Sequence, residues 1–268
     1  LTQDEERIGP DLRIHNSSTS DEFNNAFNLF KDWIKERQFE LIGISIMSHH
    51  WDTFVKMTRV IRETLPDCKI IAGNVHAWYV DPIGTLEHCD YVCAAEGEEL
   101  YSKLVDHLSA KPDVSPICIP GLIEKHQGKT IHNPVKTYMP MDEIPFPTYG
   151  DKKTYSINAI NEDKPIILNR DFMVDGHWGF VHIGRGCVFR CTFCINAIHK
   201  DPTVRLRSID RVIAEIKKML DVCKNVKSIF FMDEIFPVRN SFLTEFCEKY
   251  KKHINLPFQV TLYPHMLS

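Results

Sequence analysis

Three cysteines within eight residues constrain this chain more than any other feature. Cys187, Cys191 and Cys194 are separated by three residues and then by two, which is close enough for one compact metal centre. A structural zinc site normally closes with four protein ligands, and an ordinary cubane iron–sulfur cluster is likewise held by four thiolates. A cubane held by three thiolates keeps one iron open for another molecule. The spacing therefore favours a cluster that binds a second component directly.

Composition excludes several other classes. The formal net charge of −4 gives no broad basic surface, so nucleic acid is not the expected partner. No apolar run approaches the roughly 18 residues that a membrane span needs. Crowded thiols without a secretory signal segment favour a metal site in a reducing, cytoplasmic setting. The remaining cysteines stand among apolar residues, and we interpret them as small hydrophobic residues in or near the core. They are Cys68, Cys89, Cys93, Cys118, Cys223 and Cys247.

Hydrophobic periodicity divides the chain into three parts. Residues 1–110 alternate between helical and strand-like patterns and predict a doubly wound α/β unit. Residues 111–178 are rich in proline and predict a linker with short β pieces, including a hairpin that turns at Gly128. Residues 179–268 resume the alternation and predict a βαβαβ unit. The chain lacks an initiator methionine and stops directly after a strand-like run, so we expect it to be a fragment.

The cysteine motif and its context resemble the radical S-adenosylmethionine (radical SAM) superfamily. An aromatic residue, Phe193, precedes the last cysteine, and a strand and a glycine-containing stretch lead into the first. The resemblance implies that residues 179–268 are the N-terminal half of a partial (βα)6 barrel of the TIM type. It also implies a [4Fe-4S] cluster on the three cysteines, with the open iron taking S-adenosylmethionine.

In that family an electron cleaves the cofactor to a 5′-deoxyadenosyl radical, which implies a reductant such as ferredoxin or flavodoxin as a partner. Phe193 is expected near the cofactor. Asp233 and Glu234 end the second predicted strand, where barrel active sites collect, and they resemble the acidic strand end that contacts the methionine part of S-adenosylmethionine. An N-cap role for one of the two carboxylates is the competing interpretation.

The N-terminal unit resembles the flavodoxin-like, cobalamin-binding-type domain of one branch of this superfamily. Ser45 and Gly73 occupy strand ends where that branch has serine and glycine, and Ala95–Glu99 resembles its glycine and glutamate turn. Asn74 stands in place of a second glycine, and the branch's lower-face histidine motif is not found. The resemblance implies that Ser45, Gly73 and Asn74 contact cobalamin; a similar domain that holds no corrinoid is the alternative.

Together these features predict a radical SAM enzyme that acts on a small-molecule substrate, with cobalamin-dependent methyl transfer to an unactivated carbon as the leading reaction. An oxidative cyclase or rearrangement enzyme without methyl transfer is the second reading. The third, from another class, is a zinc-stabilised binding module in which His182 or His199 completes the metal site.

Overall fold

The computed structural model describes residues 11–14, 20–110, 116–150, 154–158, 166–169, 176–197, 203–263 and 266. They form two compact units. The N-terminal unit holds residues 20–139. The cysteine-loop unit holds residues 11–14, 140–150 and everything described from Thr154 onward.

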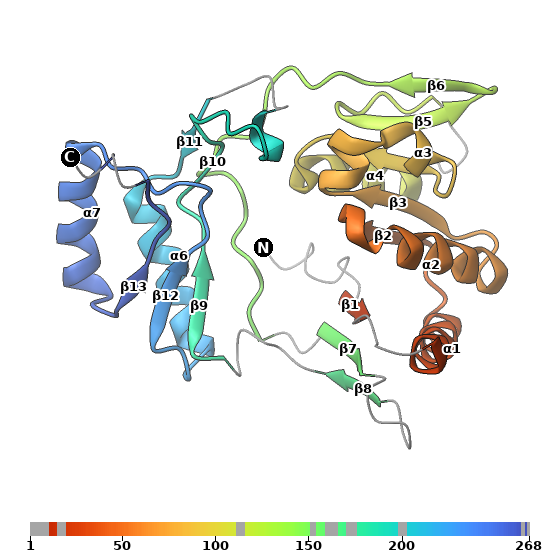
Figure 1. Ribbon diagram of the computed structural model, residues 1–268, viewed down its shortest axis with the longest axis horizontal. Helices are drawn as coiled ribbons and strands as arrows, with labels where there is room; N and C mark the ends of the chain where they lie inside the picture. Colours follow the sequence, from red (N-terminus) through yellow and green to blue (C-terminus); the bar gives the residue numbers. More distant parts are fainter. Residues whose placement is uncertain are drawn as a thin grey trace. The chain divides into compact units, whose positions relative to one another are not determined.

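The N-terminal unit is built on a five-stranded sheet in the order β2-β3-β4-β5-β6 (Figure 1). The first three strands are parallel, and the last two are antiparallel to their neighbours. The strands are β2 (Leu41–Ser45), β3 (Lys69–Gly73), β4 (Tyr91–Cys93), β5 (Leu122–His126) and β6 (Lys129–His132). The helices are α1 (Ser20–Arg37), α2 (Trp51–Thr64), α3 (Pro82–Leu86) and α4 (Gly97–Ala110), with short turns η1 (Ser48–His50) and η2 (His76–Val80).

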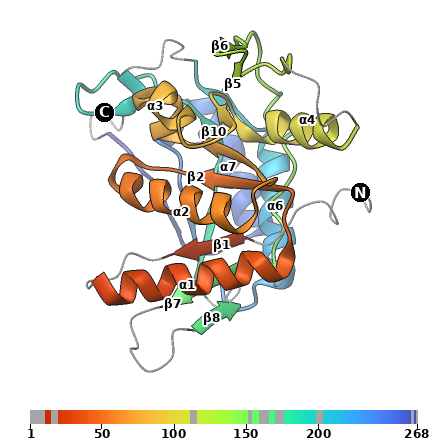
Figure 2. The ribbon, with the colours of Figure 1, turned by 90° about the vertical axis from the view of Figure 1, so that its right-hand side faces the viewer.

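Burial on both faces explains why the inner parallel strands β3 and β4 are almost continuously apolar. Ile71, Tyr91 and Cys93 pack with Leu100 and Leu104 of α4 in one cluster. Alternate residues of the same strands point to the opposite face. Figure 2 shows α1 running alongside α2 within this unit. The parallel core and its covering helices agree with the α/β fold class that the sequence predicts.

The hairpin of β5 and β6 extends this sheet. Gln127 and Gly128 both have positive φ, of 49° and 75°, in the two-residue connection that joins the strands, a backbone that suits a tight hairpin turn. The hairpin at Gly128 is therefore confirmed, but it pairs with β4 instead of standing in a separate linker. The strands of this sheet lie side by side in the order in which they occur in the chain. In a flavodoxin-like sheet the strand order reverses partway across the sheet, so the two sheets differ in topology.

The cysteine-loop unit contains three parallel strands in the order β13-β12-β9 (Figure 1). Chain order and spatial order agree, as they do where a barrel begins. The strands are β9 (Trp178–Val181), β12 (Ser228–Phe231) and β13 (Phe258–Gln259), connected through α6 (Ile209–Val222) and α7 (Asn240–His253). A short antiparallel pair, β10 (Gly184–Arg185) and β11 (Arg205–Leu206), and a turn, η3 (Ile195–Ala197), accompany them.

Helix α6 shows why this unit folds as the sequence indicates. The Ser208 hydroxyl accepts a hydrogen bond of 3.3 Å from the Arg211 amide and so caps the first turn. The helix buries an apolar stripe, of which Ile216 and Met219 are fully covered, against Ile229 and Phe231 of β12. At roughly 1.5–3 kcal/mol for each large buried side chain, this stripe stabilises the unit far more than helix propensity does.

A third sheet, in the same unit, joins β1 (Asp11–Ile14), β7 (Thr154–Asn158) and β8 (Ile166–Asn169) in the order β1-β7-β8. The sequence did not predict it. Across the described parts of the chain, no helix is long and apolar enough to cross a membrane.

Candidate functional site

The cysteine loop, residues 186–197, leaves the short strand β10 and ends in η3. Gly186 begins it at a φ of +99°, in the left-handed region that favours glycine. A Cβ atom at this position would lie 2.6 Å from the backbone oxygen of Thr203. The glycine before Cys187 is therefore required by the close approach of Thr203, which lies just before β11.

All three predicted ligands are free, partly exposed cysteines on this loop. The amide of Cys194 donates to the carbonyl of Cys191 at 2.9 Å, which makes a tight turn between these two ligands. The hydroxyl of Tyr263 lies 3.2 Å from the Cys191 sulfur. This hydrogen bond and the Cys191 charge raise the pKa of Tyr263, with smaller contributions from burial and then from Cys187 and Cys194. The phenol of Tyr263 therefore lies in contact with the thiol of Cys191.

The chemistry of the donor set fits an iron–sulfur cluster, because three cysteines without disulfide bonds lie on one short loop. Within the described residues, however, no three His, Cys, Asp or Glu side chains converge closely enough to form a metal-holding group. His182, one candidate for completing a zinc site, lies at the exit of β9 with an exposed side chain. His199, the other, lies outside the described residues. The zinc alternative stays a hypothesis.

Phe193 projects from the loop and is 88% exposed, the most exposed of the large hydrophobic side chains described. Its position between Cys191 and Cys194 places it beside the predicted ligands, and its contact with a cofactor stays a prediction. Phe189, at the other end of the motif, stacks on the ring of Tyr263 with 4.6 Å between centroids.

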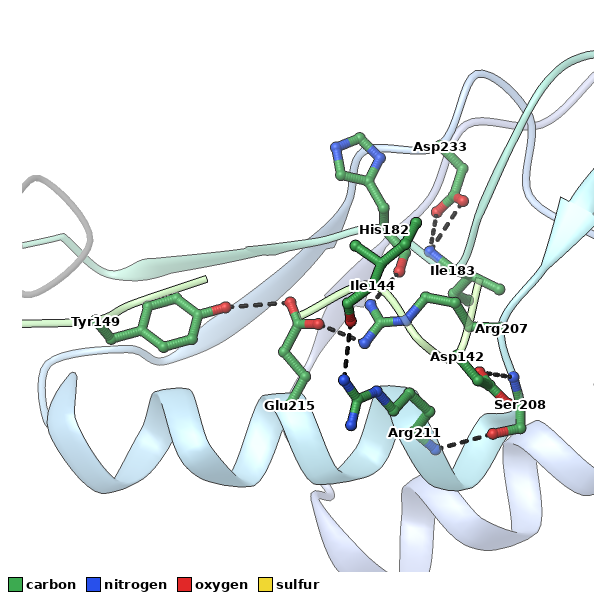
Figure 3. Close-up of polar contacts among 10 residues, drawn as sticks. All are labelled: Asp142, Ile144, Tyr149, His182, Ile183, Arg207, Ser208, Arg211, Glu215 and Asp233. Carbon is green, nitrogen blue, oxygen red and sulfur yellow. Dashed lines mark hydrogen bonds and ion pairs between the residues drawn. The ribbon is translucent and has the colours of Figure 1, made fainter. Parts of the chain in front are cut away.

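The two carboxylates at the end of β12 have different surroundings. Asp233 is 5% exposed, and its oxygens accept hydrogen bonds from the amide of Ile183, at 2.9 and 3.0 Å (Figure 3). They also accept from the amide of Gly184, at 2.6 Å. Burial raises the pKa of Asp233, and these two amide bonds oppose the increase. Glu234 is exposed. Asp233 thus ties the end of β12 to the segment that enters the cysteine loop, whereas Glu234 remains accessible.

A buried ion pair holds the same segment from the other side. Arg207 and Glu215 are 2.5 Å apart, with side chains 8% and 5% exposed. The Arg207 guanidinium also donates to the backbone oxygen of His182 at 2.9 Å. Tyr149 donates to Glu215 at 3.1 Å (Figure 3), and burial followed by the Glu215 charge raises the pKa of this phenol. The exit of β9 is therefore bonded to α6 through a desolvated charge pair.

Residues 142–149 pack on this network. Asp142 accepts from the amide of Ser208 at 2.8 Å, and the backbone oxygen of Ile144 accepts from Arg211 at 2.8 Å (Figure 3). The Arg211 guanidinium lies 3.7 Å from the ring centroid of Phe146, a cation–π contact. The sequence placed this segment in a linker, and the structure shows that its polar and aromatic side chains cover the start of α6.

In the N-terminal unit, the residues predicted to contact cobalamin come together at one sheet edge. Ser45 and Gly73 are register partners at the ends of β2 and β3. The Asn74 side chain donates to the Ser45 hydroxyl at 2.9 Å and accepts from the Val75 amide at 2.7 Å. Asn74 has a φ of +77°, so it adopts the backbone conformation that glycine would adopt here. Corrinoid contact itself stays a prediction.

His76 belongs to the same edge and was not singled out by the sequence. It is 9% exposed, its Nδ1 lies 3.0 Å from the Ser48 hydroxyl, and its ring packs on Trp51 at 4.8 Å. Its Nε2 is buried and has no hydrogen-bond partner among the described residues. The available signal was its position three residues after the end of β3, at the carboxyl edge of the sheet, where ligands bind in α/β folds.

A cavity of about 350 Å³ lies beside the start of α4. Glu96, Glu98 and Glu99 of the predicted turn line it, together with Lys136 and Tyr138 from the segment after β6. Ser45, Gly73 and Asn74 are not among its lining residues.

Comparisons with known proteins place the fold. No family model matches the chain. It is 27% identical over 208 residues to an uncharacterized methyltransferase of Pyrococcus horikoshii, covering 76% of this chain and 41% of that protein. It is 24% identical over 218 residues to the cytidylyl-2-hydroxyethylphosphonate methyltransferase of Streptomyces wedmorensis, covering 70% and 38%. The chain thus spans about two fifths of the length of these relatives.

Two solved structures share the fold. The radical S-adenosylmethionine methyltransferase TsrM from Kitasatospora setae, with tryptophan and a SAM analogue bound, superposes with a TM-score of 0.64 at 14% identity, covering 87% of this chain and 44% of TsrM. The cobalamin-dependent S-adenosylmethionine radical enzyme OxsB, with aqua-cobalamin and S-adenosylmethionine bound, superposes with a TM-score of 0.65 at 20% identity. The match covers 87% of this chain and 31% of OxsB. The mixed α/β arrangement with parallel-sheet cores is therefore that of these proteins.

Proposed function

We propose that the chain is part of a cobalamin-dependent radical SAM enzyme that transfers a methyl group to a small-molecule substrate. One observation carries the proposal. The three cysteines lie on the loop that follows the first strand of a parallel βαβαβ unit, and the phenol of Tyr263 contacts the Cys191 sulfur. The similarity in fold to TsrM and OxsB supports it. In this interpretation β9, β12 and β13 begin a partial barrel.

Cys187, Cys191 and Cys194 would hold a [4Fe-4S] cluster. Such a cluster would supply one electron, taken from a reductant such as ferredoxin or flavodoxin, for the cleavage of S-adenosylmethionine to a 5′-deoxyadenosyl radical. The chain's own residues orient this chemistry. Gly186 sets the start of the loop, Phe193 projects beside the ligands, and Asp233 anchors the strand exit.

Within the acidic pair we propose a division of roles. The amino group of S-adenosylmethionine needs an acceptor that solvent and ligand can reach, and Glu234 is exposed at the carboxyl end of β12. Asp233 is the second carboxylate expected near the cofactor, and its bonds to Ile183 and Gly184 give it a further role in fixing the distance between β12 and the cysteine loop.

For the N-terminal unit we propose cobalamin as the ligand, with Ser45, Gly73 and Asn74 at the contact edge. The hydrogen bond between Asn74 and Ser45 joins the two strand ends, and the positive φ of Asn74 keeps the backbone in a glycine-like conformation there. Backbone can then approach a flat ligand closely despite the missing second glycine.

The cluster is tested by purifying the chain without oxygen, reconstituting it with iron and sulfide, and measuring metal, sulfide and visible absorption. We expect about four irons per chain in the wild type, as a cubane requires. Cys191→Ala should lose most of them. Cys247→Ala, which alters an exposed free cysteine of α7, should not. Zinc without iron or sulfide would refute the proposal and favour the binding module.

The reaction is tested with the protein from the complete reading frame and S-adenosylmethionine labelled in its methyl group. Label recovered in a small-molecule product supports methyl transfer. Cleavage to 5′-deoxyadenosine without label transfer would instead support the cyclase or rearrangement reading.

A further inference from the structure

Tyr263 contacts the cysteine loop from a distant part of the chain. It follows β13 and lies 72 positions after Cys191 in the sequence. Its ring stacks on Phe189 with an interplanar angle of 29°, and its hydroxyl lies 3.2 Å from the Cys191 sulfur. The ring and the hydroxyl therefore contact different residues of the same motif.

The direction of this hydrogen bond follows from the chemistry of a metal ligand. A cysteine that binds iron does so as a thiolate, which has no proton to donate. The phenol must then donate to the Cys191 sulfur. Hydrogen bonds to ligand sulfurs are one of the means by which a protein sets the reduction potential of an iron–sulfur cluster, because they stabilise the more negative, reduced state.

We propose that Tyr263 is a positioning residue for the cluster whose hydroxyl raises the reduction potential through Cys191, while its ring supports the loop through Phe189. This inference rests on the proposed function, since it requires a cluster on the three cysteines. It follows that the chain segment after β13, together with the cysteine motif, sets the reduction potential of the cluster.

The ring and the hydroxyl can be separated by substitution. Tyr263→Phe keeps the stacking on Phe189 and removes only the donor. We expect this variant to bind as much iron and sulfide as the wild type and to show a more negative midpoint potential in a redox titration followed by electron paramagnetic resonance. Phe189→Leu removes the stacking and should lower the iron retained after gel filtration, with the potential of the remaining cluster changed less.

Tyr101→Phe provides a matched control. Tyr101 lies on α4 in the N-terminal unit and is 37% exposed, the same fraction as Tyr263. It should leave both iron content and potential unchanged. Equal potentials in wild type and Tyr263→Phe, with full iron in both, would overturn this inference alone. A wild-type protein that binds no iron–sulfur cluster would overturn the proposed function and this inference with it.

Discussion

Breaking the buried pair of Arg207 and Glu215 should destabilise the cysteine-loop unit strongly. Glu215→Gln keeps the shape of the side chain and an acceptor for Tyr149, but it removes the charge 2.5 Å from a guanidinium that is 8% exposed. Removing one partner of a buried pair costs roughly 3–5 kcal/mol, because the other charge stays desolvated and uncompensated. Because the amide oxygen of Gln is retained as an acceptor, we expect a loss of stability near the lower end of that range, at about 3 kcal/mol.

Hydrogen exchange followed by mass spectrometry measures this loss within one unit. Since each 1.4 kcal/mol is a factor of ten, peptides from α6 should exchange roughly 100-fold faster in Glu215→Gln where exchange requires the unit to open. Glu99→Gln is the matched control, because Glu99 pairs with Lys103 at 2.5 Å with both side chains about half exposed. An exposed pair contributes about 0–1 kcal/mol, so α4 should exchange nearly as in the wild type.

A double substitution makes the reasoning refutable. Arg207→Met with Glu215→Leu replaces both charges by apolar groups, and buried pairs replaced in this way often lose little stability. The double variant should therefore exchange more slowly than either single apolar variant. Exchange in α6 that is the same in Glu215→Gln and wild type would show that the pair is not desolvated as the structure has it.

Three further predictions concern the approach to the cysteine loop. Asp233→Ala leaves two buried amides without their acceptor, at roughly 1–3 kcal/mol each, and should speed exchange around β10, whereas Glu234→Ala should change stability by less than about 0.5 kcal/mol. Burial raises the folded pKa of Asp233, so its stabilising contribution is lost as pH rises through that value. Urea unfolding should thus favour wild type over Asp233→Asn more at about pH 4 than at about pH 7, and equal differences would contradict the burial. Gly186→Ala places a Cβ 2.6 Å from the Thr203 oxygen and should lower iron retention, while Gly97→Ala, which meets nothing within 4 Å, should not.

The sequence predicts well those features that depend on residues close together in the chain. The apolar stripe of α6 and its Ser208 cap are local, because each depends on residues a few positions apart. The turn at Gly128 is local too, but which strand the hairpin pairs with is decided by distant partners. Its assignment to the sheet therefore could not follow from periodicity.

The same limit applies to the candidate site. The spacing of the three cysteines can be seen directly in the sequence, whereas the bond between Asp233 and Ile183 joins residues 50 positions apart. The carboxylates at 233 and 234 look alike in sequence, and only their surroundings distinguish a buried anchor from an exposed acceptor. Tyr263 belongs to the strand-like run at the end of the given sequence, whereas the strand in the structure covers only Phe258–Gln259.

The hydrogen bonds and the ion pair near the cysteine loop hold the segment before the loop and leave the thiols available to the proposed cluster. The exit of β9 is held by Asp233 of the neighbouring strand end and by Arg207, whose charge is fixed by Glu215 on α6. These bonds act on residues 182–184, before Gly186, and none of them involves a thiol. A network placed there fixes where the loop starts without occupying a sulfur that the proposed cluster would use. Within the described part of the chain, the hydrogen bond to a sulfur of the three cysteines joins Cys191 to Tyr263. The Tyr263 hydroxyl is a neutral donor, which suits a thiolate acceptor.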